Sequence, residues 1–306
     1  MTSPALTDGA PAKVALRHRL SERGVDTLLL LALPASAFMV VLFFYPAAYG
    51  VYLSFHPLPG GGGFFGNYRA FFTQPYMRNS ILNTFRIALP AALINVIIAV
   101  PVSLVMRRRI HGQKTLNTLL VVPITLGTVL VAQGLLIYLG PKGWLNRTLM
   151  ALGILSNPVQ LIYTNWGVII ALIITGFPFA FMLTASYLSG INPNLEAAAG
   201  TLGASAWRRF TNVTFPLLAP GLAITFCLTF VLAFSVFPSA QLLGNASGGA
   251  HVLAIAAANA AFQDYNYPMA SAISVITAVI ELIVVALVLG LRSRLYAGST
   301  SSAGKA

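Results

Sequence analysis

The sequence predicts an all-α polytopic membrane protein with six transmembrane helices, and three observations lead to this fold class. Of the 306 residues, 57% are hydrophobic and only 8% are charged, whereas soluble domains carry about 25% charged residues. The mean hydropathy is +0.81. The Lys and Arg residues fall in short bursts between apolar runs, which favours membrane topology over the single basic surface of a nucleic-acid-binding protein.

Six apolar segments are long enough to cross a bilayer, which requires about 20 mostly apolar residues in a helix. They cover roughly residues 26–54, 80–106, 115–139, 166–189, 217–240 and 269–291. The first segment follows a polar tail and is too long for the core of a signal peptide, so we expect it to be a retained span. Prolines within most of the spans predict kinks.

Two of the connecting segments have a distinctive composition. The stretch "HPLPGGGGFFGNY" (56–68) is rich in Gly and Pro and is typical of turns. The stretch "AHVLAIAAANAAF" (250–262) is apolar but too short to span, so we expect an interfacial or re-entrant helix there. The sequence contains no internal repeat, and the region 26–291 is expected to form one transmembrane domain.

The distribution of positive charge predicts the orientation of the spans. Thirteen of the 18 Lys and Arg residues lie in the segments 1–25, 107–114, 190–216 and 292–306. By the positive-inside rule these segments are cytoplasmic. The chain is therefore predicted to be a multi-pass inner-membrane protein with a cytoplasmic N-terminal tail (1–25) and a cytoplasmic C-terminal tail (292–306).

The segment 190–216 has the pattern of two short helices joined by a turn. Asn192-Pro193 is a good helix start, and Gly203 is a suitable stop for the first helix. Ser205 is placed to cap the second helix. Pro216 is expected to end the cytoplasmic segment 190–216 before the fifth span begins.

The second short helix carries an aromatic anchor beside two positive charges. Trp207 and Phe210 are three residues apart, and Arg208 and Arg209 lie between them. Such a helix is suited to fill a groove on another protein. It is equally suited to lie on lipid headgroups, so on these residues alone both interpretations stand.

The stretch "LGASAWRRFTNVTFPLLAP" resembles the cytoplasmic signature loop of ABC importer permeases, the EAA loop. In that family a short coupling helix in the loop docks into a cleft of the ATPase subunit. The family pattern runs Gly-Ala, an aromatic residue, a basic stretch and Leu-Pro-x-x-x-Pro before the penultimate span. The matching positions are Gly203, Ala204, Trp207, Phe210, Pro216 and Pro220. The resemblance implies the six-helix fold of a type I ABC importer permease.

One position departs from the family pattern. Counting back from Gly203, the family's glutamate falls at Ala197, and the nearest acidic residue is Glu196. One residue turns a side chain by about 100° around a helix. Either Glu196 performs the structural task from one position earlier, or the task is absent from this subunit.

The resemblance also implies partners. The chain has no GxxxxGK[ST] phosphate loop, so ATP and Mg are expected to be used by a separate ATPase subunit, present as a dimer. A second permease half, identical or homologous, an extracytoplasmic binding protein and membrane lipid complete the expected assembly, without nucleic acid. The single cysteine, Cys227, and four scattered histidines have no metal-ligand spacing, so we expect neither enzyme activity nor a bound cofactor or metal.

Four residues are candidates for lining a translocation pathway. Glu281 lies in the middle of the sixth span, where a charge costs ~2.5–3.5 kcal/mol on insertion scales. It is either a pathway residue or the buried partner of a polar neighbour such as Asn83 or Asn95. The other candidates are at the outer end of the fifth span, where hydrogen bonding between helices is the alternative: Ser235, Ser239 and Gln241.

The substrate class is suggested by resemblance alone. Leu202-Gly203-Ala204, and "FQDYNYPMASAISVI" before the sixth span, are similar to polyamine-type permeases, which implies import of putrescine or spermidine. The same importer class carrying 2-aminoethylphosphonate, ferric iron, thiamine or a sugar is an alternative. An ion-coupled secondary transporter is the alternative from another class, but it usually shows an inverted second half, which this sequence lacks.

Overall fold

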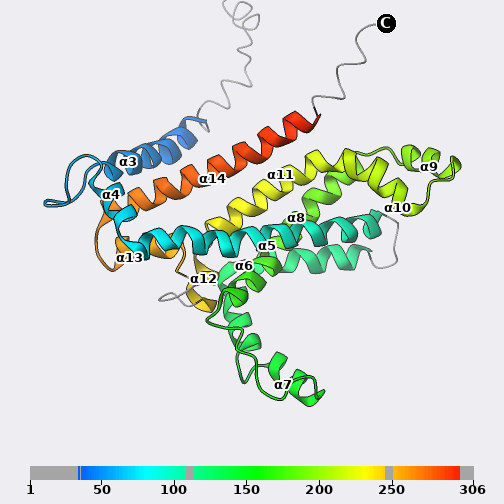
Figure 1. The fold of residues 1–306 in the computed structure, drawn as a ribbon, viewed down its shortest axis with the longest axis horizontal. Coiled ribbons are helices and arrows are strands. Elements are labelled where there is room, and N and C mark those ends of the chain that lie inside the picture. The colour runs from blue at the N-terminus through cyan, green and yellow to red at the C-terminus, as the bar shows by residue number, and fades with distance from the viewer. Residues whose placement is uncertain (1–33, 35, 108–112, 245–250, 297–306) are drawn as a thin grey trace, which may run out of the picture. The chain divides into compact units, whose positions relative to one another are not determined.

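The computed structural model describes residues 34, 36–107, 113–244 and 251–296, and every regular element within these ranges is a helix (Figure 1). The chain divides into two compact units, Met1–Tyr52 and Leu53–Ala306. The expected tail 1–25, residues 26–33 of the first expected span and most of the tail 292–306 lie outside the described residues.

The first unit contains the first span. A single π-helical turn, η1 (Val40–Phe44), leads into α3 (Tyr45–Ser54). Tyr45, Tyr49 and Tyr52 recur at a spacing of four and three residues, which places them on one helix face. Their rings stack in succession, with centroids 6.5 and 6.3 Å apart.

The prediction of six spans is confirmed for the described residues. Six helical segments are long and apolar enough to cross a membrane. They are Ser36–Ser54, Pro75–Arg107, Thr118–Ala151, Asn165–Ser189, Ala206–Phe234 and Tyr267–Arg292. The third of these segments includes a turn after Leu139 and the short helix α7 (Trp144–Ala151), so the spanning helix itself is α6 (Gln113–Leu139).

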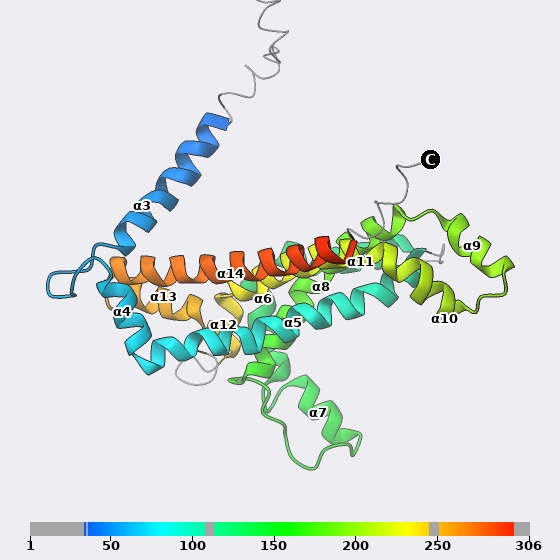
Figure 2. The same cartoon turned by 45° about the horizontal axis from the view of Figure 1, so that its top comes forward.

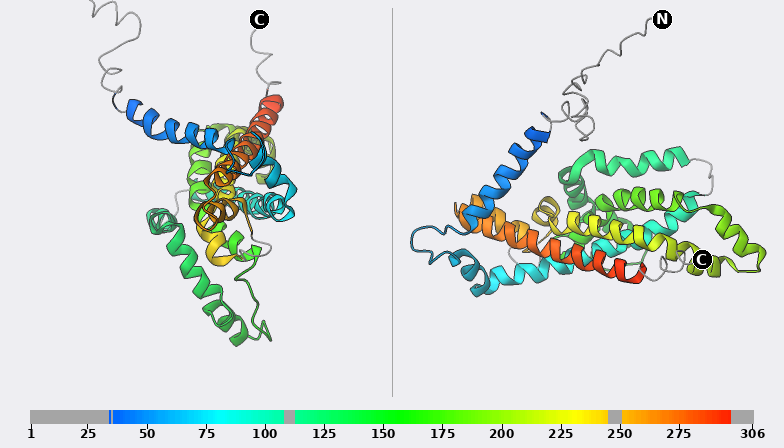
Figure 3. Two further views of the ribbon diagram at one scale, coloured as in Figure 1. Left: turned by 90° about the vertical axis from the view of Figure 1, so that its left-hand side faces the viewer. Right: turned by 90° about the horizontal axis from the view of Figure 1, so that it is seen from above.

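Three long helices form the centre of the second unit. α5 (Pro75–Arg107) packs along α8 (Asn165–Ser189), and α11 (Phe215–Phe234) lies against both (Figures 1 and 3). Small side chains at the contacts allow the backbones to approach closely. The fully buried alanines of α5 and α8 are Ala88, Ala91, Ala92, Ala99, Ala171 and Ala180.

Aromatic rings fill the space where α5 meets α11. The Phe85 ring lies 6.0 Å from that of Phe230 and 5.1 Å from that of Phe234, measured between centroids. Phe230 and Phe234 are fully buried. Rings at these separations gain attraction beyond the area that they bury, so this cluster fixes the rotation of α11 on α5.

The third span has a break at a glycine in addition to the proline kink that the sequence predicts. Gly127 interrupts α6 with φ 73° and ψ 161°. This conformation is accessible to glycine and strained for residues with a Cβ atom. Pro123, one turn earlier, also removes a backbone hydrogen bond, so the two residues together redirect the helix.

The fifth span also differs from its predicted limits of 217–240. The helix begins at Ala206, passes through the π-helical turn η2 (Phe210–Thr214), continues as α11 and ends at Phe234. The prediction that Pro216 separates the segment 190–216 from the fifth span was therefore wrong. Pro216 stands in the first turn of α11, directly after the π-helical turn η2, and the helical course continues through it.

At its other end the fifth span stops earlier than predicted. A separate helix, α12 (Pro238–Leu243), follows a break at residues 235–237. Pro238 has no N–H to donate and begins α12 after this break, at a position where a proline is favoured.

The short apolar helix predicted within 250–262 is present as α13 (Leu253–Phe262). It packs against α5 and α14 (Tyr267–Tyr296), and Leu253 and Ile255 are fully buried. Two polar contacts hold its start to α5. The Leu253 backbone N–H donates to Thr84 Oγ1 at 2.9 Å, and Asn83 Nδ2 donates to the His251 carbonyl at 3.3 Å.

Candidate functional site

The segment 190–216 lies at one end of the second unit, opposite α13 and the short helix α4 (Gly66–Thr73) (Figure 2). The two predicted helices are present as α9 (Pro193–Thr201) and α10 (Ala206–Arg209). Asn192 caps α9 by accepting a hydrogen bond from the Asn194 N–H at 3.0 Å. Ser205 caps α10 by accepting from the Arg208 N–H at 3.4 Å. The predicted helix starts are therefore confirmed.

Gly203 ends α9 as predicted, with a φ of 80°. The Gly203 N–H donates to the Gly200 carbonyl, and the Ala204 N–H donates to the Ala199 carbonyl, each at 3.0 Å. This pair of bonds is a Schellman motif, which requires a left-handed residue and therefore favours glycine. Gly203 and Ala204 thus form the sharp turn that separates the two short helices.

The outer surface of α9 and α10 is exposed, and neither helix contains a buried residue. Trp207 exposes 72% of its surface, and Arg208 beside it is exposed. The Trp207 ring lies 5.8 Å from the Phe210 ring, which lies 5.9 Å from that of Phe215 at the start of α11. A row of aromatic rings therefore connects the exposed indole to the fifth span.

Glu196 faces the bundle, whereas Ala197 is exposed. Arg107 Nη1, at the end of α5, donates to Glu196 Oε1 at 2.7 Å. Thr214 Oγ1 donates to the same oxygen at 2.9 Å. Arg107 Nη2 also donates to the Ile191 carbonyl at 2.6 Å. In the sequence Arg107 is one of the thirteen positive charges that predict the topology, and no local pattern pairs it with Glu196.

The structure brings two of the pathway candidates together. Ser235 Oγ donates to Glu281 Oε1 at 2.6 Å, which joins the break after α11 to α14. Ser239 is buried on α12, and no described residue hydrogen bonds to its hydroxyl. Gln241 is exposed and is not brought to Glu281 by any contact in the described ranges.

The expected partners of Glu281 were wrong. Asn83 donates to the His251 carbonyl at 3.3 Å. Asn95 donates to the Leu172 carbonyl of α8 at 3.2 Å. Both amides thus donate to backbone carbonyls elsewhere in the bundle. The side chain that bonds the Glu281 carboxylate is Ser235, another of the pathway candidates.

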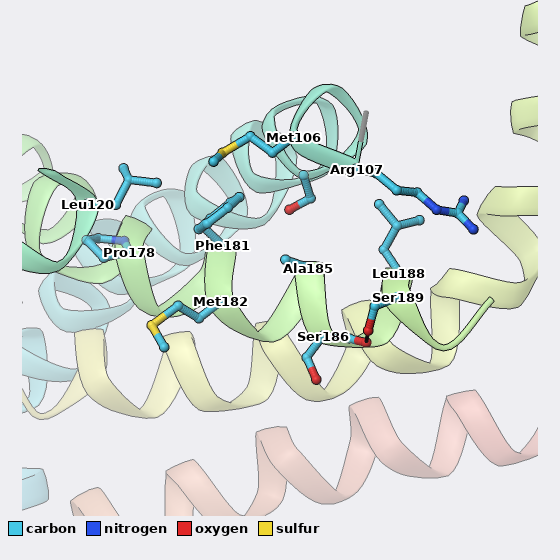
Figure 4. Close-up of a pocket in the computed structure, with 11 residues that line it drawn as sticks. Met106, Arg107, Leu120, Pro178, Phe181, Met182, Ala185, Ser186, Leu188 and Ser189 are labelled. Carbon is cyan, nitrogen blue, oxygen red and sulfur yellow. Dashed lines mark hydrogen bonds between the residues drawn. The ribbon is translucent and has the colours of Figure 1, made fainter. Parts of the chain in front are cut away.

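Two cavities lie on either side of the end of α5. The first has a volume of about 520 Å³, is open to the surface and is lined by residues of α5, α6 and α8 (Figure 4). Its wall is mostly apolar, and Figure 4 shows Met106, Phe181 and Met182 around it. The buried Ser103 also lines it, and no described residue hydrogen bonds to the Ser103 hydroxyl.

The second cavity has a volume of about 970 Å³ and lies between α5 and the elements from α9 to α11. Its wall includes Ile97, Val100 and Leu104 of α5 together with Trp207 and Phe210. Arg107 lines both cavities. Glu196 lines only the second of the two.

Groups of three or more His, Cys, Asp or Glu side chains that could hold a metal ion do not occur in the part of the chain that the structure describes. Cys227 is buried inside α11. The candidate site is the exposed surface of α9 and α10 together with the polar contacts of Arg107 and Glu196 behind it.

Comparison with known proteins supplies a family. Residues 93–296 match the family model described as "Binding-protein-dependent transport system inner membrane component". The probable sulfate transport system permease protein cysT of Prototheca wickerhamii is 32% identical over 206 residues, which is 67% of this chain and 79% of that protein. The spermidine/putrescine transport system permease protein PotB of Haemophilus influenzae is 31% identical over 215 residues, or 68% and 72% of the two chains.

A solved structure has the same fold. A chain in the crystal structure of a bacterial alginate ABC transporter, in complex with alginate pentasaccharide-bound periplasmic protein, superposes with a TM-score of 0.77 at 22% sequence identity. The match covers 90% of this chain and 97% of that one.

Proposed function

Because the chain belongs to the family of binding-protein-dependent transport system inner membrane components, and is a permease subunit of an ABC importer, we propose that its segment 190–216 docks on a separate ATPase subunit. The observation that supports this role is the exposed Trp207 on a capped helix that leads directly into the fifth span. Movement of α10 is thereby passed to α11 without an intervening flexible linker. The ATPase subunits, as a dimer, supply ATP hydrolysis with Mg.

The residues proposed to form the docking surface are exposed or half-buried members of the segment 190–216. They are Glu196, Ala197, Gly203, Ala204, Trp207, Arg208, Arg209, Phe210 and Pro216. Glu196 acts from within, by bonding to Arg107 of α5, and Pro216 lies exposed in the first turn of α11. Glu196 is paired inside the subunit, and Ala197 has only a methyl group, so neither residue presents a carboxylate to the ATPase.

The proposed orientation places the docking surface in the cytoplasm. Thirteen of 18 Lys and Arg residues lie in segments that this orientation makes cytoplasmic, including the tails 1–25 and 292–306. A second permease half completes the pathway, and a binding protein delivers cargo on the opposite side. The alginate transporter, whose fold this chain shares, was crystallised with its periplasmic protein.

The coupling role is tested by deletion of residues 204–210 in the assembled importer. We expect the spans to insert normally and ATP-driven uptake to be lost, because the row of rings from Trp207 to α11 is removed. Uptake in inverted or right-side-out vesicles measures ATP-driven transport, and protease protection of the chain measures insertion of the spans. Normal uptake by the deleted protein would refute the proposal.

For the cargo we propose a small organic cation of the putrescine or spermidine type. Glu281 is the one acidic side chain of the described residues within the six spans, and it bonds Ser235 at the break after α11. A carboxylate that lines a pathway attracts cations. The similarity to a spermidine/putrescine permease supports the same class.

Sulfate is a second candidate, because a probable sulfate permease matches at 32% identity, about as well as the polyamine permease at 31%. Calorimetry of the partner binding protein against both cargoes, with 2-aminoethylphosphonate, ferric iron, thiamine and sugars included, separates the classes. We expect binding of putrescine or spermidine. Tight binding of sulfate or of a sugar alone would overturn the polyamine proposal.

Glu281→Gln tests the same proposal in the permease. Removing the charge is expected to lower the kcat/KM of polyamine uptake about tenfold or more, since hydrogen bonds to charged groups contribute roughly 1.5–3 kcal/mol. Glu281→Asp, which retains the carboxylate, serves as the matched control and should retain more activity. Equal uptake by all three proteins would place Glu281 outside the pathway.

A further inference from the structure

We propose that Arg107 and Glu196 form a latch that holds the end of α5 to the segment 190–216, so that movement of this segment carries α5 with it. Arg107 is thus a positioning residue for coupling, a role that neither its sequence context nor the family match assigns. The inference rests on the proposed docking of the segment on an ATPase subunit. The function of the latch is to make the docking surface and the second span move as one rigid body.

The geometry of the contact supports a rigid connection. Arg107 makes two hydrogen bonds from the fixed fork of its guanidinium, one to Glu196 Oε1 at 2.7 Å and one to the Ile191 carbonyl at 2.6 Å. Such a fork specifies orientation as well as distance. Thr214 adds a third bond, to Glu196 Oε1 at 2.9 Å. The latch therefore connects α5, the end of α8, α9 and η2.

Few other contacts tie α9 to the bundle, whereas α10 continues through η2 into α11. Neither α9 nor α10 contains a buried residue. A small apolar cluster, separate from the main core, contains the buried residues Leu188, Ile191 and Leu218. Val100 and Leu104 of α5 pack against it. Arg107–Glu196 is also the one ion pair of the described residues, so it is the specific polar link between α9 and α5.

The two cavities leave room for the latched elements to move. Arg107 lines the cavity of about 520 Å³ on the α6 and α8 side, and also the cavity of about 970 Å³ on the α10 and α11 side. The end of α5 is therefore not packed tightly on these two sides. The side chain of Arg107 is 22% exposed and that of Glu196 is 31% exposed, so the pair is largely shielded from water and is screened less than a surface pair.

The test uses the complete importer, with ATPase subunits, both permease halves and binding protein, in proteoliposomes. Cargo uptake and ATP hydrolysis are measured in parallel for Arg107→Gln and Glu196→Gln. We expect the amount of cargo transported per ATP hydrolysed to fall about tenfold in each variant, while the ATPase remains associated. That factor corresponds to the loss of one charge-assisted hydrogen bond. Arg107→Lys retains a cation and should recover part of the ratio.

Arg147→Gln is the control for loss of a positive charge. Arg147 is exposed on α7, away from the described contacts of the segment 190–216, and its replacement should leave the ratio unchanged. Wild-type coupling in both Arg107→Gln and Glu196→Gln would overturn the latch. If instead Trp207→Ala and the deletion of 204–210 leave ATPase association and uptake intact, the proposed docking fails, and with it the premise of the latch.

A covalent substitute for the ion pair distinguishes a latch from general stabilisation. Arg107→Cys and Glu196→Cys are combined in a Cys227→Ala background and joined with a reducible thiol cross-linker of side-chain length. We expect the cross-linked importer to couple ATP hydrolysis to uptake and to lose coupling when the linker is reduced. Loss of uptake on cross-linking would show that the two elements must separate during transport, and would overturn the proposal.

Discussion

Trp207 exposes 72% of its surface on a four-residue helix that has no buried side chain. Its ring nevertheless has a fixed setting, because Phe210 and then Phe215 continue the row of rings into α11. A large aromatic side chain that is held in place but uncovered is typical of the central anchor of an interface. Lipid contact is the alternative, and removal of the ring has a different consequence in each case.

Trp207→Ala is expected to weaken binding of the ATPase subunit about thirtyfold. Truncation of such an anchor typically costs at least ~2 kcal/mol, and 1.4 kcal/mol corresponds to a factor of ten in affinity. Titration of purified ATPase onto the permease in detergent or nanodiscs measures the change. Unaltered affinity, combined with weaker membrane contact of α10, would instead indicate that the ring rests on lipid.

Glu196 illustrates how a single side chain changes the interpretation of a motif. The family's position for a glutamate is occupied by Ala197, which is exposed, while Glu196 one residue earlier turns inward to Arg107. The rotation of about 100° per residue separates the two roles. The carboxylate thus bonds within the subunit, to Arg107 and Thr214.

At the level of whole helices, the breaks in the spans are as informative as their lengths. α6 is redirected at Gly127, and α11 is separated from α12 at residues 235–237. At the second break, Ser235 bonds to Glu281 of α14. Non-helical backbone at membrane depth is tolerated where it is buried in protein or lines a water-filled cavity. Both breaks are therefore expected to face the interior of the assembled permease pair.

Gly127→Ala is expected to destabilise the folded permease by about 1–3 kcal/mol, because a residue with a Cβ atom is strained at this φ and ψ. Gly134→Ala, in the same helix, provides the matched control. An added Cβ at Gly134 meets no atom within 4 Å, and alanine is the better helix former, so no loss of stability is expected. The unfolding temperatures of the two variants in detergent are compared with that of the wild type. Equal unfolding temperatures for both variants would contradict the break at Gly127.

The whole molecule is a multi-pass membrane protein whose second unit presents α9 and α10 at one end and α4 and α13 at the other (Figure 2). Positive charge gathers in the segments expected at the α9 and α10 end. The asymmetry of thirteen residues against five predicts that this end is cytoplasmic.

This orientation predicts the labelling of two exposed positions. In a Cys227→Ala background, Thr148→Cys on α7 should react with a membrane-impermeant maleimide in intact cells. Ser205→Cys, which is also exposed, should react only after the membrane is permeabilised. The opposite pattern would mean that the chain inserts the other way round.

Much of the architecture was predictable because its causes are local in the chain. Apolar runs of about 20 residues identify spans whatever surrounds them, and all six were found. Asn192, Ser205 and Gly203 each act through hydrogen bonds or dihedral angles within a few residues of themselves. The helix starts and the sharp turn in the segment 190–216 are therefore determined by the sequence.

Other features depend on how distant helices are rotated and aligned against each other. Arg107 and Glu196 are 89 residues apart, and Ser235 and Glu281 are 46 apart. No local pattern pairs them. Their meeting reflects the register of α5, α8, α11 and α14, which is set by the sum of many weak packing contacts along each helix. For the same reason the predicted partners Asn83 and Asn95 were wrong. The sequence predicts a kink in α6 from Pro123, but only the structure shows that the positive φ falls on Gly127 and not on Gly134.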